Sequence, residues 1–132
     1  MLDKLRKRLR SQKGFTLIEL LVVMIILAIL TAIAIPSYLS FRDRANNSAA
    51  GADLRAAIPS VEAYFSDHGT YTGMTAASLK LSYDQSIDTG IVSVVSASGT
   101  SYCVMATSPN DSTKTASKRG PDAQIKIGDT CA

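Results

Sequence analysis

The chain has 132 residues, of which 46% are hydrophobic and 19% are charged, and its formal net charge is +3. This length suits a single domain. Residues 1–14 carry six basic side chains and one acidic one, whereas the remaining residues carry eight basic and ten acidic ones. Because the positive excess belongs to a short leader, the charge balance gives no support to nucleic-acid binding.

An apolar segment follows this leader. Residues 15–35 are apolar except for Glu19 and two threonines. As a helix they would extend about 31 Å, which matches the hydrocarbon core of a bilayer. The basic leader places the N-terminal side in the cytoplasm by the positive-inside rule. The sequence therefore predicts one membrane-spanning helix with the rest of the chain outside.

Residues 36–68 are expected to continue this helix. Pro36 ends the apolar run, but a proline inside a long helix removes one hydrogen bond without having to end it. Beyond Pro36, apolar residues recur at helical spacing and form a stripe that would face a globular head. These residues are Leu54, Ile58, Val61 and Phe65. Gly69 is the expected C-terminal stop.

The C-terminal part, residues 69–132, has short β-prone runs. Residues 91–96 and 101–107 predict a hairpin, and the alternating residues 123–127 predict a third strand. Residues 108–121, with two prolines and many polar side chains, are expected to form an exposed loop. The expected fold is α+β: a long N-terminal helix packed on a small antiparallel sheet.

Two cysteines, Cys103 and Cys131, lie in this small head. An even pair behind a membrane segment favours a disulfide in an oxidising compartment. Two unrelated reduced thiols are the alternative. A bridge would close a loop that stabilises the head by about 3.5 kcal/mol.

The boundary between leader and apolar segment is the most informative feature. Glu19 stands five positions after Gly14, inside a run otherwise fit to cross a bilayer. A charge at the bilayer centre costs roughly 2.5–3.5 kcal/mol, and less near a helix end. An ordinary membrane anchor gains nothing from this carboxylate, so we expect it to have a partner.

This boundary resembles the processing site of type IV pilins and pseudopilins. In that family a glycine precedes the cut, phenylalanine follows it, and glutamate is the fifth mature residue, as Gly14, Phe15 and Glu19 are here. The resemblance covers the leader, the apolar helix and Pro36, and extends loosely to the head and its cysteine pair. It implies that residues 1–14 form a leader that is cleaved after Gly14.

The resemblance also implies roles and partners. A membrane prepilin peptidase would cut the chain and methylate the Phe15 amine, and Glu19 would pair with the Phe15 amine of a neighbouring subunit. Such a pair penalises subunits that slide out of register, because either charge alone is costly to bury. Pro36 would mark where the helix bends or unwinds in the filament. The subunit would be a single-pass inner-membrane protein first and part of an extracellular homopolymer afterwards, assembled by inner-membrane machinery.

Other polar clusters support simpler interpretations. Four aspartates could supply calcium ligands, but their spacing matches no EF-hand loop; they are Asp84, Asp88, Asp122 and Asp129. A small basic cluster could touch DNA, but a solvated loop explains it as well; it comprises Lys114, Lys118 and Arg119. No nucleophile–base pair, metal-binding set or phosphate loop is visible, so we expect neither an enzyme nor a cofactor.

The sequence leaves several functions open. The first is a structural subunit of a type IV pilus that serves adhesion, twitching motility or DNA uptake. The second is a pseudopilin of a type II secretion system. An ordinary single-span protein with a binding head, or a membrane-tethered enzyme, would keep its leader and never free the Phe15 amine. The plain length and the cysteine pair favour the pilus subunit.

Overall fold

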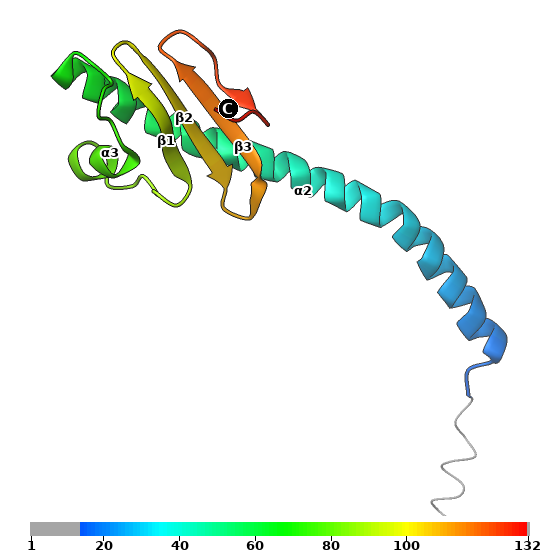
Figure 1. The fold of residues 1–132 in the computed structure, drawn as a ribbon. Coiled ribbons are helices and arrows are strands. Elements are labelled where there is room, and N and C mark those ends of the chain that lie inside the picture. Colours follow the sequence, from blue (N-terminus) through cyan, green and yellow to red (C-terminus); the bar gives the residue numbers. More distant parts are fainter. Residues whose placement is uncertain (1–13, 132) are drawn as a thin grey trace, which may run out of the picture. The chain divides into compact units, whose positions relative to one another are not determined.

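The computed structural model describes residues 14–131. Within them the chain forms a long helix, a short helix and one antiparallel sheet with the strand order β1-β2-β3-β4 (Figure 1). The elements are α2 (Leu17–His68), α3 (Ala76–Ser82), β1 (Val92–Ser98), β2 (Ser101–Ser108), β3 (Asp111–Gly120) and β4 (Lys126–Ile127). The chain divides into two compact units at Leu39/Ser40. The expected α+β class is confirmed.

Helix α2 runs without interruption through Pro36 and ends at His68, as the sequence predicts. Its stop depends on Gly69, which has a φ of 67° and whose backbone N–H donates to the Phe65 carbonyl at 2.7 Å. A residue without a Cβ adopts this left-handed conformation without steric cost. The expected C-terminal stop is therefore confirmed.

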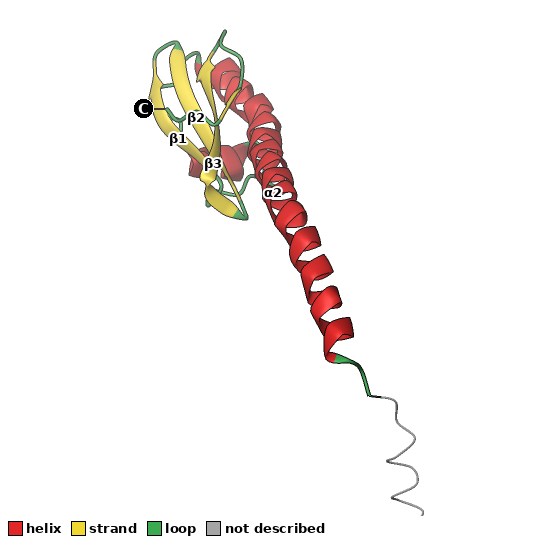
Figure 2. Cartoon of the chain, turned by 90° about the vertical axis from the view of Figure 1, so that its right-hand side faces the viewer, coloured by secondary structure: helices red, strands yellow, loops and turns green. Residues whose placement is uncertain are grey.

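In the second unit α2 packs against one face of the sheet (Figure 2). Leu54 and Val61 are fully buried, as the predicted stripe requires, whereas Ile58 and Phe65 are only partly buried. The centre of the interface also includes Ala50, Ala57 and Tyr64. Small side chains between large ones allow the two layers to interdigitate. Hydrophobicity alone did not indicate that the buried face of α2 is centred on these residues rather than on Ile58 and Phe65, because alanine is only weakly apolar.

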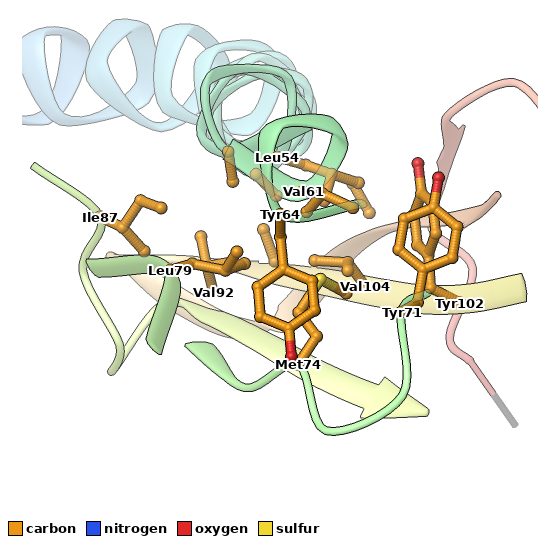
Figure 3. Packing of buried hydrophobic residues seen from close by; sticks show 14 residues of the cluster. Leu54, Val61, Tyr64, Tyr71, Met74, Leu79, Ile87, Val92, Tyr102 and Val104 are labelled. Atoms are coloured by element: carbon orange, nitrogen blue, oxygen red, sulfur yellow. The ribbon is translucent and has the colours of Figure 1, made fainter. Parts of the chain in front are cut away.

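The core lies between α2, the sheet and the segment that joins them (Figure 3). Val92 of β1 and Val104 of β2 meet Leu54 and Val61 from the helix in one cluster. The joining segment adds Tyr71, Met74 and Leu79, of which Leu79 belongs to α3. This helix was not predicted; Thr75 caps it, in a reciprocal capping box with Ser78.

The prediction that residues 108–121 form an exposed loop is wrong. Most of this segment is β3, which lies inside the sheet between β2 and β4. Its polar composition hid the strand, because Ala116 is its single fully buried apolar side chain while Thr115 and Ser117 are buried under the C-terminal tail. The third predicted strand, 123–127, shortens to β4, which pairs only with Ala116 and Ser117.

The C-terminal tail covers the outer face of β3. The hydroxyls of Thr115 and Ser117 donate to Asp129, to its backbone carbonyl at 3.1 Å and its carboxylate at 3.0 Å respectively. Arg119 donates to the Thr130 carbonyl at 3.0 Å. Cys131 then forms a disulfide with Cys103 of β2, which confirms the expected pairing. The bridge and these hydrogen bonds hold the tail across the sheet.

A carboxylate on α2, that of Glu62, joins the helix to the connecting segment and to β2. Glu62 accepts hydrogen bonds from the hydroxyls of Tyr71 at 2.8 Å and Tyr102 at 2.9 Å. The two rings meet edge to face, 4.7 Å apart. Burial, followed by the bond to the Glu62 carboxylate, raises the pKa of Tyr71 to about 12 and also raises the pKa of Tyr102. Both phenols therefore stay protonated donors at neutral pH.

Gly120 leaves space for the Tyr102 ring, whose hydroxyl donates to Glu62. It pairs with Tyr102 across β2 and β3, and a Cβ at Gly120 would overlap the Tyr102 ring. We expect Gly120→Ala to displace the ring and weaken its bond to Glu62, lowering the free energy of unfolding by about 2–3 kcal/mol. Urea unfolding of the purified protein measures this change.

Gly99→Ala is the matched control, because a Cβ there meets no atom within 4 Å. Its effect should stay within about 0.5 kcal/mol. Equal stability of the Gly120→Ala and Gly99→Ala variants would show that the ring has room to move.

Candidate processing and assembly site

The predicted cleavage point lies in a short exposed segment just before α2. Gly14, Phe15 and Thr16 precede the first helical residue, Leu17. No atom lies within 4 Å of where a Gly14 side chain would be, and Phe15 is 85% exposed. Residues 1–13 of the expected leader lie outside the described residues. An exposed peptide bond outside regular structure is accessible to a peptidase.

Glu19 is held by the N-terminal turn of its own helix. Its carboxylate accepts from the Thr16 backbone N–H at 2.8 Å and from the Thr16 hydroxyl at 2.9 Å. In return, the Glu19 backbone N–H donates to the Thr16 hydroxyl at 3.2 Å. This is a capping box, which satisfies free N–H groups at the helix start. The role of Thr16 was not predicted, although the pattern Thr-x-x-Glu is visible in the sequence.

The carboxylate lies at the edge of an apolar surface. Phe15, Ile18, Glu19 and Val22 line one open hollow of about 590 Å³. The N-terminal end of the helix dipole favours a negative charge here. A carboxylate has about four lone-pair positions, so the two bonds from Thr16 leave capacity for a further cation. Among the described contacts, none joins the Phe15 nitrogen to the Glu19 carboxylate of the same chain.

The apolar part of α2 exposes its side chains on all sides. The large hydrophobic residues from 17 to 35 are 47–82% exposed, and the most apolar window has a mean hydropathy of 3.0. Within the described residues, α2 is long and apolar enough to cross a membrane. Large exposed apolar surfaces mark contacts with lipid or with other proteins. Pro36 stands at the end of this surface, inside the helix.

The other polar clusters make contacts within the head. Residues 14–131 contain no group of three or more side chains placed to hold a metal ion. Lys114 pairs with Asp43 at 3.3 Å, and Lys118 donates to the backbone carbonyls of Pro121 and Ala123. Arg119 contacts Asp129. These basic side chains are thus occupied within the head.

Comparison with known proteins agrees with the boundary motif. Residues 9–35 match the prokaryotic N-terminal methylation motif. The chain is 44% identical over 98 residues to the type IV wide pilus major component PilA4 of Thermus thermophilus, which covers 74% of this chain and 75% of that relative. The chain belongs to the type IV pilin family.

Two further relatives match a smaller part of this pilin. It is 42% identical over 60 residues to the type IV major pilin protein PilA of Myxococcus xanthus, covering 46% of the pilin and 27% of that relative. It is 40% identical over 62 residues to the type II secretion system core protein G of Pseudomonas aeruginosa, and the match covers 47% of the pilin and 44% of that relative. The relatives thus support a structural subunit of a pilus, with a secretion-system protein as the alternative, in a family of structural proteins.

Proposed function

We propose that this pilin is the major subunit of an extended surface pilus that serves adhesion, twitching motility or DNA uptake. The support comes from its relatives: PilA4 of Thermus thermophilus and PilA of Myxococcus xanthus are named as a major pilus component and a major pilin.

Maturation begins with cleavage between Gly14 and Phe15. A prepilin peptidase removes residues 1–14 on the cytoplasmic face and methylates the new Phe15 amine. The accessible, non-helical position of this bond supports the proposal. So does the match to the N-terminal methylation motif, which spans the bond.

Before assembly the subunit is a single-pass inner-membrane protein. Residues 15–35 span the bilayer, while residues 36–68 and the head, residues 69–132, lie outside. The length and hydropathy of this part of α2 support the span. Inner-membrane assembly machinery then moves the helix from lipid into the filament. The two surroundings are similarly apolar, so the transfer itself changes the free energy little.

In the filament the Glu19 carboxylate pairs with the Phe15 amine of a neighbouring subunit. The position of Glu19 on an apolar surface, with lone pairs left by the Thr16 capping box, supports this role. A subunit out of register would bury an unpaired charge, which is strongly unfavourable. Pro36 lets the helix bend or unwind in the filament, because its ring removes one backbone hydrogen bond.

The observation that carries this function is the exposed apolar surface of residues 17–35 with a carboxylate at its N-terminal end. An anchor that only faced lipid would need the apolar surface but not the carboxylate. A polymer that alternates between lipid and neighbouring helices uses both.

Mass spectrometry of surface fibres tests the proposal. Fibres are sheared from cells, and the N-terminal peptide of the pilin is read in the fibre and membrane fractions. We expect an abundant fibre peptide that begins with N-methylated Phe15. A leader of residues 1–14 that remains intact in every fraction would contradict the processing scheme.

A pseudopilin of a type II secretion system is the second candidate function. The match to core protein G of Pseudomonas aeruginosa favours it. The same fractions separate the two functions. A methylated Phe15 peptide that is confined to membranes would indicate the pseudopilin, whereas abundance in sheared fibres would indicate the pilus subunit.

A further inference from the structure

Two exposed side chains lie on α2 just beyond its apolar segment. Phe41 is 71% exposed, and Arg44 is exposed as well. They are three residues apart, so their directions differ by only about 60° and they share one face of the helix. The buried Asn46 and Ala50 mark the side of α2 that the head covers. Phe41 and Arg44 each point about 120–180° away from these two residues, and we call them the outer pair.

The head supplies no anion for Arg44. Among the ion pairs of the described residues, none includes Arg44. Its neighbours one turn away on α2, at positions 40, 41, 47 and 48, carry no charge. The other charges of this segment are directed at the head: Asp43 pairs with Lys114 at 3.3 Å, and Arg42 lies within electrostatic range of Asp111. The guanidinium of Arg44 therefore calls for an anion from outside the subunit.

Spacing along α2 places the outer pair at the level of lipid headgroups when the apolar segment spans a bilayer as proposed above. At a rise of about 1.5 Å per residue, Phe41 stands about 9 Å and Arg44 about 13.5 Å beyond Ile35, where the apolar run ends. The headgroup layer adds about 5–7 Å on each side of the hydrocarbon core. Helical side chains slant toward the N-terminal end, so both side chains reach back toward this layer.

We propose that the outer pair binds an anionic phospholipid while the pilin is still in the membrane. Phe41 lies in the headgroup interface, where aromatic rings are enriched. The Arg44 guanidinium binds the lipid phosphate, to which it can donate two parallel hydrogen bonds. The pair continues the apolar surface of the span, and its charge is complementary to the phosphate. A lipid with a net negative headgroup is preferred because it attracts the arginine more strongly than a zwitterionic one does.

This contact fixes the depth of the helix in the bilayer. Glu19 and Phe41 are 22 residues apart in the sequence, which is about 33 Å of helix and close to the thickness of a hydrocarbon core of about 30 Å. Holding Phe41 in one headgroup layer keeps Glu19 near the opposite boundary, where a carboxylate costs less than at the bilayer centre. Extraction of the subunit into a filament then has to break the lipid contact.

Tryptophan fluorescence measures this depth. The chain contains no tryptophan, so Phe41→Trp supplies a single reporter at an exposed position. The full chain is reconstituted into vesicles of phosphatidylcholine and phosphatidylglycerol with the same composition in both leaflets, which makes its orientation immaterial. We expect strong quenching by lipids brominated near the headgroup and weak quenching by aqueous acrylamide. Ser48→Trp is the matched control, because position 48 is exposed on the same face two turns farther from the bilayer; its quenching should be the reverse.

The same reporter measures which lipid occupies the contact. Brominated phosphatidylglycerol and brominated phosphatidylcholine are compared at equal mole fraction. We expect phosphatidylglycerol to bind beside position 41 roughly fivefold more tightly. Arg44→Gln should bring this ratio close to one, whereas Arg44→Lys should keep most of it because the charge remains. Arg55→Gln is the matched control: Arg55 stands three turns beyond Arg44 on the same face, so the ratio should not change.

Each contrary result overturns a stated part of the contact. A reporter at position 41 that acrylamide quenches as strongly as the one at position 48 would overturn the lipid contact and favour another copy of the pilin on this face. Equal lipid preference in Arg44→Gln and the parent chain would overturn phosphate binding by Arg44. These vesicles need no fibres, so either result leaves the pilus subunit intact. A pilin that does not insert into the vesicles would overturn the proposed span and the contact together.

Discussion

Glu19→Val is expected to leave cleavage after Gly14 intact and to abolish filament assembly. The exposed bond between Gly14 and Phe15 does not depend on the Glu19 side chain. In the filament, however, valine would leave the neighbouring Phe15 amine without its anion. Breaking a buried ion pair costs about 3–5 kcal/mol, which corresponds to a loss of fibre of roughly a hundredfold or more. Mature subunits should accumulate in the membrane.

Immunoblots of sheared and membrane fractions, with the N-terminal peptide read by mass spectrometry, measure both steps. Thr31→Val is the matched control, because it replaces another polar residue of the same helix whose hydroxyl bonds only the Leu27 carbonyl. Its fibres should be normal. Normal fibre yield from Glu19→Val would disprove the pairing with the Phe15 amine.

A Thr16 variant in the same experiment tests how much the capping box with Glu19 contributes to assembly. Thr16→Val removes the hydroxyl that donates to Glu19 and accepts from its N–H, but keeps the Thr16 backbone donor. Loss of a capping side chain costs about 1 kcal/mol. We therefore expect a partial loss of fibre that Thr16→Ser restores, between the wild type and Glu19→Val.

Loss of the disulfide should have the largest effect on the stability of the head. Cys103 and Cys131 are 28 residues apart, and the chain-entropy treatment gives a stabilisation of about 3.5 kcal/mol for such a loop. Without the bridge, the tail is held to β3 mainly by Thr115, Ser117 and Arg119. The Cys103→Ser/Cys131→Ser variant should release this tail and lower the free energy of unfolding by that amount.

Urea unfolding and amide hydrogen exchange of the C-terminal peptides measure this effect. Asp129→Asn is the control for the tail's polar contacts alone. It weakens the pairing of Asp129 with Arg119 but keeps the bridge, and its cost should be about 1 kcal/mol or less. Equal stability of the wild-type and cysteine-free proteins would mean that hydrogen bonds suffice to hold the tail.

The family and the helix could be read from the sequence because their signals are local. The motif Gly14-Phe15 with Glu19, the length of the apolar run and Gly69 as a stop each lie within a few residues of one another. Periodicity placed Leu54 and Val61 in the core for the same reason, since one helix face follows from spacing alone. The capping box of Thr16 was equally local and was missed only because Glu19 already had an expected partner.

The sheet depended on contacts between distant segments. β3 reads as a polar loop until Asp129 of the tail covers Thr115 and Ser117, so its strand character depends on residues 12–14 positions away. Glu62 meets Tyr102 across 40 residues, and Gly120 is required only because that ring lies against it. No pattern within a single segment contains such information.

The sequence by itself thus determined the family of this pilin and predicted which residues at the leader boundary serve processing and assembly. Only the tertiary structure decided how the head is closed. The physical reason is the range of the interactions. Helix formation and membrane insertion depend on neighbouring residues, whereas strand pairing and buried hydroxyls depend on which distant segments the fold brings together.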